Sequence, residues 1–144
     1  MLKSNNSKFR SKCPISCSLD IFGDKWSLLI IRDMVIEQKK TFKDFFSSNE
    51  KIASNILTSR LKSLEKIGII SKNSALNNKK TNIYKLTDSG LSLIPTLVEM
   101  TIWSENNINF YKKRSESFSS SIKNKQKYIE KIQSKYLRSF DNIL

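Results

Sequence analysis

The sequence predicts a mainly α-helical fold with one small β-hairpin, an α+β architecture built as one compact domain with a C-terminal extension. Three observations predict it. Apolar residues recur at helical spacing over most of the chain, two short strand-like runs flank a turn sequence, and 144 residues with 38% hydrophobic content suit a single modest core.

A first amphipathic helix is expected between Pro14 and Gly23. Proline suits the first turn of a helix, and glycine commonly follows the last turn. The intervening stretch ISCSLDIF places three apolar residues on related faces: Ile15, Leu19 and Phe22.

Two further helices are expected before residue 50. Asp24 is a plausible N-cap for a second helix from about Lys25. Its core-facing residues would be Trp26, Leu29 and Ile30. After the polar break EQKK, the segment TFKDFF predicts a very short helix with one apolar face: Phe42, Phe45 and Phe46.

The segment IASNILTSRLKSLEKIG predicts the clearest helix, with Gly68 as its stop. Its apolar stripe consists of Leu57, Leu61, Leu64 and Ile67. Its other face carries small polar and basic residues: Ser54, Asn55, Thr58, Ser59 and Lys62. Such side chains hydrogen-bond to base edges and phosphates. The alternative is an ordinary solvated face, but hydroxyl and amide residues are weak helix formers, so their density favours a second requirement.

The runs IISKNS and TNIYKL predict a β-hairpin, because the intervening ALNNKK contains the turn-forming pair Asn77-Asn78. Lys79 and Lys80 are expected at or beside its tip. A short helix, a turn, a longer helix and a basic hairpin is the order of a winged helix-turn-helix. In that design the longer helix enters the major groove and the hairpin reaches the flanking backbone or the minor groove.

Two more helices are expected in the C-terminal half. Thr87 should cap a long helix from about Asp88 to about Asn109, with Pro95 as a candidate kink. Its apolar surface is wider than one flank of a small domain requires, so a second chain is its natural cover. These residues are Leu91, Ile94, Leu97, Val98, Met100, Ile102 and Trp103. The stretch YIEKIQSKYLRSFDNIL predicts a packed terminal helix through Tyr128, Ile132, Tyr136, Phe140 and Ile143.

The charge balance indicates a polyanionic partner. The chain has 26 Lys and Arg against 13 Asp and Glu, a formal charge of +13, and residues 112–144 are its most basic part. A solvated surface that aids solubility is an equal alternative for that tail. No apolar run approaches a membrane span and the N-terminus lacks the apolar core of a secretory signal, so a cytoplasmic protein is expected.

The composition argues against metal, cofactor and catalytic chemistry. Cys13 and Cys17 are too few for a disulfide framework, and without histidine they make a poor zinc site. With three glycines, no phosphate-cradling loop and no recognisable pair of acids, the usual catalytic constellations are missing, and we expect no enzyme and no cofactor.

Four segments together resemble the HxlR-type winged-helix transcriptional regulators of bacteria, a branch close to the MarR regulators. They are CPISCSLDIFGDKWSLLIIRDM, TFKDF, ILTSRLKSLEKIGII and YKLTDSGLSLIPTLVEMTIW. The likeness covers roughly residues 13–105 in order. It implies a homodimer through the first helix and the helix after Thr87, which would bind an inverted repeat in double-stranded DNA as a repressor. By this likeness the helix of Trp26 is a scaffold that sets the angle of the recognition helix.

Residues and resemblance together predict three regions: an arm over 1–12, the DNA-binding and dimerisation domain over 13–111, and a basic extension over 112–144. The DNA-contacting candidates are Thr41, Lys43, Ser54, Asn55, Thr58, Ser59, Lys62, Lys72, Lys79 and Lys80. The chain departs from the family at Ala53, at Thr41 and at the wing lysines, which replace a usual Ser cap, an Arg and two prolines. The alternative is a winged-helix module that binds protein or RNA without sequence-specific DNA binding.

Several members of the family sense oxidants or electrophiles through a cysteine just before the first helix, and Cys13 matches that position. Lys12 and the helix N-terminus behind the thiol both favour the thiolate. Oxidation would then join Cys13 to a cysteine of the other subunit. An unreactive Cys13 with Cys17 as a small core residue is the alternative, and a bond between the two within one chain fits disulfide geometry poorly.

Overall fold

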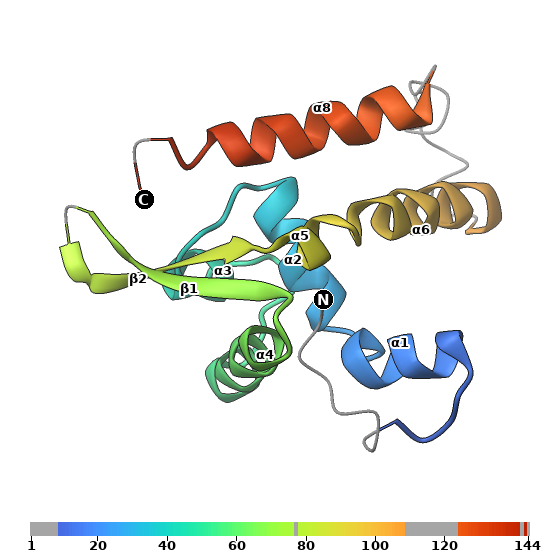
Figure 1. Ribbon diagram of the computed structural model, residues 1–144, viewed down its shortest axis with the longest axis horizontal. Coiled ribbons are helices and arrows are strands. Elements are labelled where there is room, and N and C mark those ends of the chain that lie inside the picture. The colour runs from blue at the N-terminus through green and yellow to red at the C-terminus, as the bar shows by residue number, and fades with distance from the viewer. Residues whose placement is uncertain (1–8, 77, 109–123, 142, 144) are drawn as a thin grey trace.

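The computed structural model describes residues 9–76, 78–108, 124–141 and 143. They form a mainly helical winged helix-turn-helix with a two-stranded antiparallel sheet, as the sequence predicts (Figure 1). The elements are α1 (Pro14–Phe22), α2 (Ser27–Val35), α3 (Phe42–Phe46), α4 (Ser54–Ile67), β1 (Ile70–Ala75), β2 (Asn78–Leu86), α5 (Asp88–Leu91), α6 (Ile94–Asn107) and α8 (Lys125–Arg138). No helix in these ranges has the length and apolar character needed to cross a membrane.

One core joins α2, α4, the hairpin, α6 and α8. Its fully buried side chains include Ile31, Met34, Leu57, Leu61 and Ile94, each at most 2% exposed. The predicted stripe of α4 is therefore in the core, except that Ile67 is only partly buried. Gly68 ends the helix at φ +87°, a conformation that glycine adopts without strain.

Helix α2 begins two residues later than expected. Asp24 was predicted to cap a helix from Lys25, but its Oδ1 instead accepts bonds from the N–H groups of Trp26 and Ser27 at 2.9 and 3.0 Å, and the helix starts at Ser27. Trp26 is only partly buried. The N-cap position of α2 is Trp26, which makes no side-chain cap bond, so the predicted cap and boundary are both wrong. The reason is that a turn, which the Asp24 carboxylate stabilises, precedes the first helical residue.

Helix α3 does not bury a whole phenylalanine face. Phe45 is 1% exposed and packs edge-on against Tyr84, with ring centroids 6.1 Å apart. Phe46 is 51% exposed and stacks on Phe42 instead. Five residues make little more than one turn, so only one position can point directly into the core.

The hairpin is longer than its apolar pattern indicates. Strand β2 starts at Asn78 and not at Thr81, so Lys79 and Lys80 belong to the strand beside the tip. The register pairs Ile70 with Leu86 and shifts irregularly between Ser74 and Ala75. The predicted turn residue Asn77 lies outside the described residues.

The predicted long helix after Thr87 is two helices. Thr87 caps α5 by accepting a bond from the Gly90 N–H at 3.2 Å, but α5 ends at Leu91 and α6 starts at Ile94 with Pro95 in its first turn. Proline has no N–H to bond the Leu91 carbonyl, which instead accepts a bond from the Gln133 side chain at 3.3 Å. Asn109, the predicted helix end, lies outside the described residues.

The terminal helix α8 packs against α2 and α6, as Figure 1 shows, and is part of the core. Ile129, Tyr136 and Phe140 are at most 6% exposed, and the Tyr136 hydroxyl accepts a bond from the Leu86 N–H at 2.8 Å. The prediction of a packed helix is confirmed. Residues 112–123 of the predicted extension lie outside the described residues.

Candidate nucleic-acid interface

The polar face of α4 is open to solvent. Ser54, Asn55, Thr58, Ser59 and Lys62 are all exposed, and the buried leucines of the same helix lie on its opposite side. The Thr58 hydroxyl donates to the Ser54 carbonyl at 2.8 Å, so its oxygen can still accept a hydrogen bond. Groups of this kind, held on a rigid helix, can hydrogen-bond to base edges.

The orientation of α4 is fixed by ionic contacts as well as by its leucines. The Arg60 guanidinium reaches Asp24 at 3.3 Å, which ties α4 to the turn before α2. Burial raises the pKa of Asp24, but hydrogen bonds from Ser27 and from two backbone N–H groups outweigh it and hold that pKa below its ordinary value. The carboxylate therefore stays charged at neutral pH and available to Arg60.

Helix α3 precedes α4 in the helix-turn-helix, and Thr41 is the N-cap residue of α3. The Thr41 hydroxyl accepts a bond from the Asp44 N–H at 3.2 Å, while Asp44 accepts one from the Thr41 N–H at 2.9 Å. In this capping box the Thr41 oxygen acts as an acceptor, so its hydroxyl can still donate to a phosphate. Lys43 is exposed on the same short helix.

A buried ionic cluster holds the turn between α3 and α4. Asp33, 3% exposed, accepts bonds from Arg32 at 2.9 Å, from Lys39 at 3.0 Å and from the Ser48 hydroxyl. Arg32 also forms a two-point contact with Glu50 at 2.6 and 3.0 Å, which lowers the pKa of Glu50 to about 2. A buried carboxylate with this many donors locks the segment that leads into α4.

The wing places three predicted lysines on its surface. Lys72 on β1 and Lys79 and Lys80 on β2 are all exposed. Helix α4 packs against β1 at the base of the hairpin. Helix α4 also packs against α3, which carries Lys43, so all these candidate residues lie on elements that contact one another.

The two cysteines lie at the start of α1. Cys13 is the N-cap residue, is exposed and has a free thiol, and Cys17 is partly buried. The Cys17 thiol donates to the Ser11 carbonyl at 3.4 Å. In the described ranges, no group of three or more His, Cys, Asp and Glu residues could hold a metal ion.

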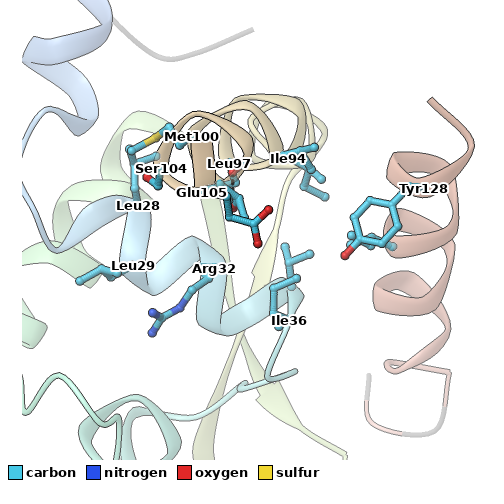
Figure 2. A pocket seen from close by; sticks show the side chains of 14 residues that line it. Leu28, Leu29, Arg32, Ile36, Ile94, Leu97, Met100, Ser104, Glu105 and Tyr128 are labelled. Atoms are coloured by element: carbon cyan, nitrogen blue, oxygen red, sulfur yellow. Dashed lines mark hydrogen bonds between the residues drawn. The ribbon is translucent and has the colours of Figure 1, made fainter. Parts of the chain in front are cut away.

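An apolar groove of about 380 Å³ lies between α2, α6 and α8. Figure 2 shows Leu28 and Met100 at one end and Tyr128 of α8 facing Ile36 and Ile94 across the other. Sequence reasoning missed this groove, because it depends on how three helices meet. It also missed the contact from Arg60 to Asp24 and the cluster around Asp33. The available signal for the cluster was the adjacent pair Arg32 and Asp33 in a largely apolar helix.

Comparisons with known proteins agree with this geometry. Residues 21–112 match the family model described as HxlR-like helix-turn-helix. The HTH-type transcriptional regulator YdeP of Bacillus subtilis is 33% identical over 93 residues, which cover 65% of this chain and 72% of YdeP.

Two solved structures extend the comparison. That of PA1607 superposes with a TM-score of 0.66 at 36% identity, covering 74% of this chain and 72% of PA1607. That of the redox regulator HypR in its reduced form gives 0.59 at 28% identity, covering 71% of this chain and all of HypR. The protein therefore belongs to the HxlR-like helix-turn-helix family of transcriptional regulators.

Proposed function

We propose that the protein is a transcriptional repressor that binds an inverted repeat as a homodimer, with α4 in the major groove and the wing on the flanking backbone. The exposed hydroxyl and amide face of α4 carries the proposal, since it lies on the second helix of a helix-turn-helix. The base-contacting residues are Ser54, Asn55, Thr58 and Ser59, and the phosphate contacts come from Thr41, Lys43, Lys62, Lys72, Lys79 and Lys80.

The proposed dimer uses α1 and the α5–α6 pair. Ile15 and Leu19 on α1 are 72% and 54% exposed, and Met100 and Trp103 on α6 are 49% and 63% exposed. Apolar side chains this open are typical of a surface that a second copy covers. A two-fold dimer would present two α4 helices to successive turns of one duplex, which explains an inverted repeat. In the proposed domain organisation, residues 1–12 are an arm, residues 13–111 bind DNA and dimerise, and residues 112–144 form the C-terminal extension.

We further propose that Cys13 is the switch. Its thiol is exposed at the N-cap of α1, inside the proposed dimer contact, and the similar protein HypR is a redox regulator solved in reduced and oxidised forms. Hydrogen peroxide would take two electrons and two protons from two thiols, that of Cys13 and that of Cys13 or Cys17 of the second copy. An S–S bond would form, the O–O bond would break, and two water molecules would leave. That bond would change the spacing of the two α4 helices.

Selection of bound fragments from genomic DNA tests the function. The expected result is one enriched inverted repeat, bound by a dimer far more tightly than random duplex, with affinity for both falling steeply as salt rises. Equal affinity for all duplexes, or binding with no salt dependence, would instead favour a winged-helix module for protein or RNA.

A non-reducing gel after mild peroxide treatment tests the switch. A band of twice the monomer mass, with altered operator affinity, is expected for the native chain and not for Cys13→Ser. An unchanged monomer band and unchanged affinity would remove Cys13 from the mechanism.

A further inference from the structure

Helix α8 carries a row of basic side chains that DNA reading by α4 does not use. The row, called the cationic stripe here, consists of Lys127, Lys131, Lys135 and Arg138. Their spacing of four, four and three residues places them within about 80° of the helix circumference and along about 16 Å of its length. All four side chains are exposed.

The opposite face of α8 is fastened to the core, so the stripe is held rigidly and points outward. Ile129 and Tyr136 are buried, Tyr136 accepts a bond from the Leu86 N–H, and Gln133 donates to the Leu91 carbonyl. A binding surface on a fixed helix loses little conformational entropy when a partner arrives. The stripe therefore differs from a loose basic tail.

The charges of the stripe have no acidic partners within the described residues. Lys125 on the same helix pairs with Glu99. Among the described residues none forms an ion pair with the stripe, and Arg138 donates to the Ser134 carbonyl. Glu130 beside the stripe accepts a bond from Gln126. Like charges at i and i+4 destabilise a helix, so the row is a cost that a bound anion would relieve.

The stripe lies on the far side of the domain from α4. In Figure 1, α8 runs along one edge of the molecule and α4 lies at the opposite edge, with α2 and the hairpin between them. Because the buried face of α8 points toward α2 and α6, its stripe points away from α4. A straight duplex seated on α4 cannot reach it.

We propose that the cationic stripe is a second, sequence-independent binding surface for duplex DNA. One strand of a duplex carries a phosphate about every 3.4 Å of axis, so a stripe of about 16 Å faces about five phosphates. Among the described residues of α8 itself, the neutral hydrogen-bonding neighbour on that face is Ser134, and Asn124 at the N-cap is bonded to the Lys127 N–H. This face therefore offers little for reading bases. The protein would thus hold two duplex segments at once, one on α4 and the wing and one on α8.

A bridging assay tests this with two random-sequence duplexes of 30 base pairs, one fixed to beads and one fluorescent. The native chain should bind the beads and capture the fluorescent duplex. Lys127→Gln with Lys131→Gln and Lys135→Gln should lower capture by at least about tenfold while bead binding changes by less than about twofold. The matched Lys→Arg triple variant keeps the charge and should capture like the native chain; Gln and Arg have similar helix propensity.

Three results of the bridging assay would overturn the proposal. Equal capture by the Gln variant would overturn the proposal and assign any bridging to the two α4 helices of a dimer. Absence of capture by the native chain, with bead binding intact, would show a solvated surface and overturn it as well. Capture that polyglutamate blocks more strongly than an equal charge of unlabelled duplex would point to an acidic protein partner and also overturn it. If the selection experiment found no preferred operator, the proposed function would fail, but the bridging assay would still test the cationic stripe, because the assay uses random-sequence duplexes.

Discussion

Helices α1 and α8 lie at the two ends of the described chain, and their packing differs sharply. Helix α8 buries two large side chains, Ile129 and Tyr136, and forms hydrogen bonds with β2 and with the end of α5. Helix α1 has no buried residue and exposes Ile15 and Leu19. Both helices are amphipathic in sequence. The difference teaches that amphipathicity shows that a helix needs a cover, while only the fold shows whether that cover lies in the same chain.

The largest effect is expected from removing the anchor of α8. Tyr136→Ala deletes a fully buried aromatic ring and should lower the free energy of unfolding by about 3–5 kcal/mol. Leu137→Ala, next to it but 41% exposed, is the matched control and should cost less than about 1 kcal/mol. Urea unfolding measures both. Similar small losses for the two variants would mean that α8 is not part of the core.

A charge on the exposed face of α1 should break the dimer and spare the monomer fold. In Ile15→Glu with Leu19→Glu, light scattering should show a monomer in place of a dimer, and operator binding should weaken by more than about tenfold. The monomer should remain folded, because neither side chain is part of its core. Asp20→Asn changes a charge on the same helix and should stay dimeric. A double variant that remains dimeric would place the contact elsewhere.

The bond that joins α8 to the wing should contribute a smaller amount. Tyr136→Phe leaves the buried Leu86 N–H without its acceptor and should cost about 1–2 kcal/mol. Burial raises the pKa of Tyr136 to about 12, against an opposing effect of the Leu86 bond. Because the neutral phenol is favoured in the folded state, its stability is present below pH 10 and is lost between about pH 10 and 12. The stability difference between native and Phe chains should shrink over that window; a constant difference would contradict this.

The smallest effect is expected at the edge of α8. Lys125→Gln breaks an exposed ion pair with Glu99 on α6 and should change stability by no more than about 1 kcal/mol. A double-mutant cycle with Glu99→Gln isolates the pair, and raised salt should remove its contribution. A coupling well above that value would show that α8 depends on its surface charges and not on its buried face.

The elements that the sequence predicted best are those in which a local pattern and the tertiary environment agree. Helix α4 combines an apolar stripe at helical spacing with a glycine stop, and the hairpin combines two strand-like runs with a turn sequence. Pro95 was predicted to kink one long helix, but the separation into α5 and α6 was not predicted, because apolar residues continue at helical spacing on both sides of the proline. Phe46 was misplaced because one turn carries too little period to define a face.

Of the interface, the exposure of the α4 residues could be predicted, since their leucine counterparts define the buried side. What fixes the angle of α4 could not. The contact from Arg60 to Asp24 joins residues 36 positions apart, and the Asp33 cluster draws its donors from three separate segments. Such pairings depend on the three-dimensional arrangement, which no local spacing encodes.

The central claim is that α4 reads bases while the wing lysines hold the backbone. The most direct measurement is the ratio of dissociation constants for random duplex and for the selected operator. Expressed as a free-energy difference, this ratio should fall by about 1–3 kcal/mol per lost base contact in Asn55→Ala with Thr58→Ala. Lys79→Ala with Lys80→Ala should weaken binding to both duplexes equally and leave the ratio unchanged. If the α4 variant lowered affinity for both duplexes equally, the assignment of base reading to α4 would be wrong.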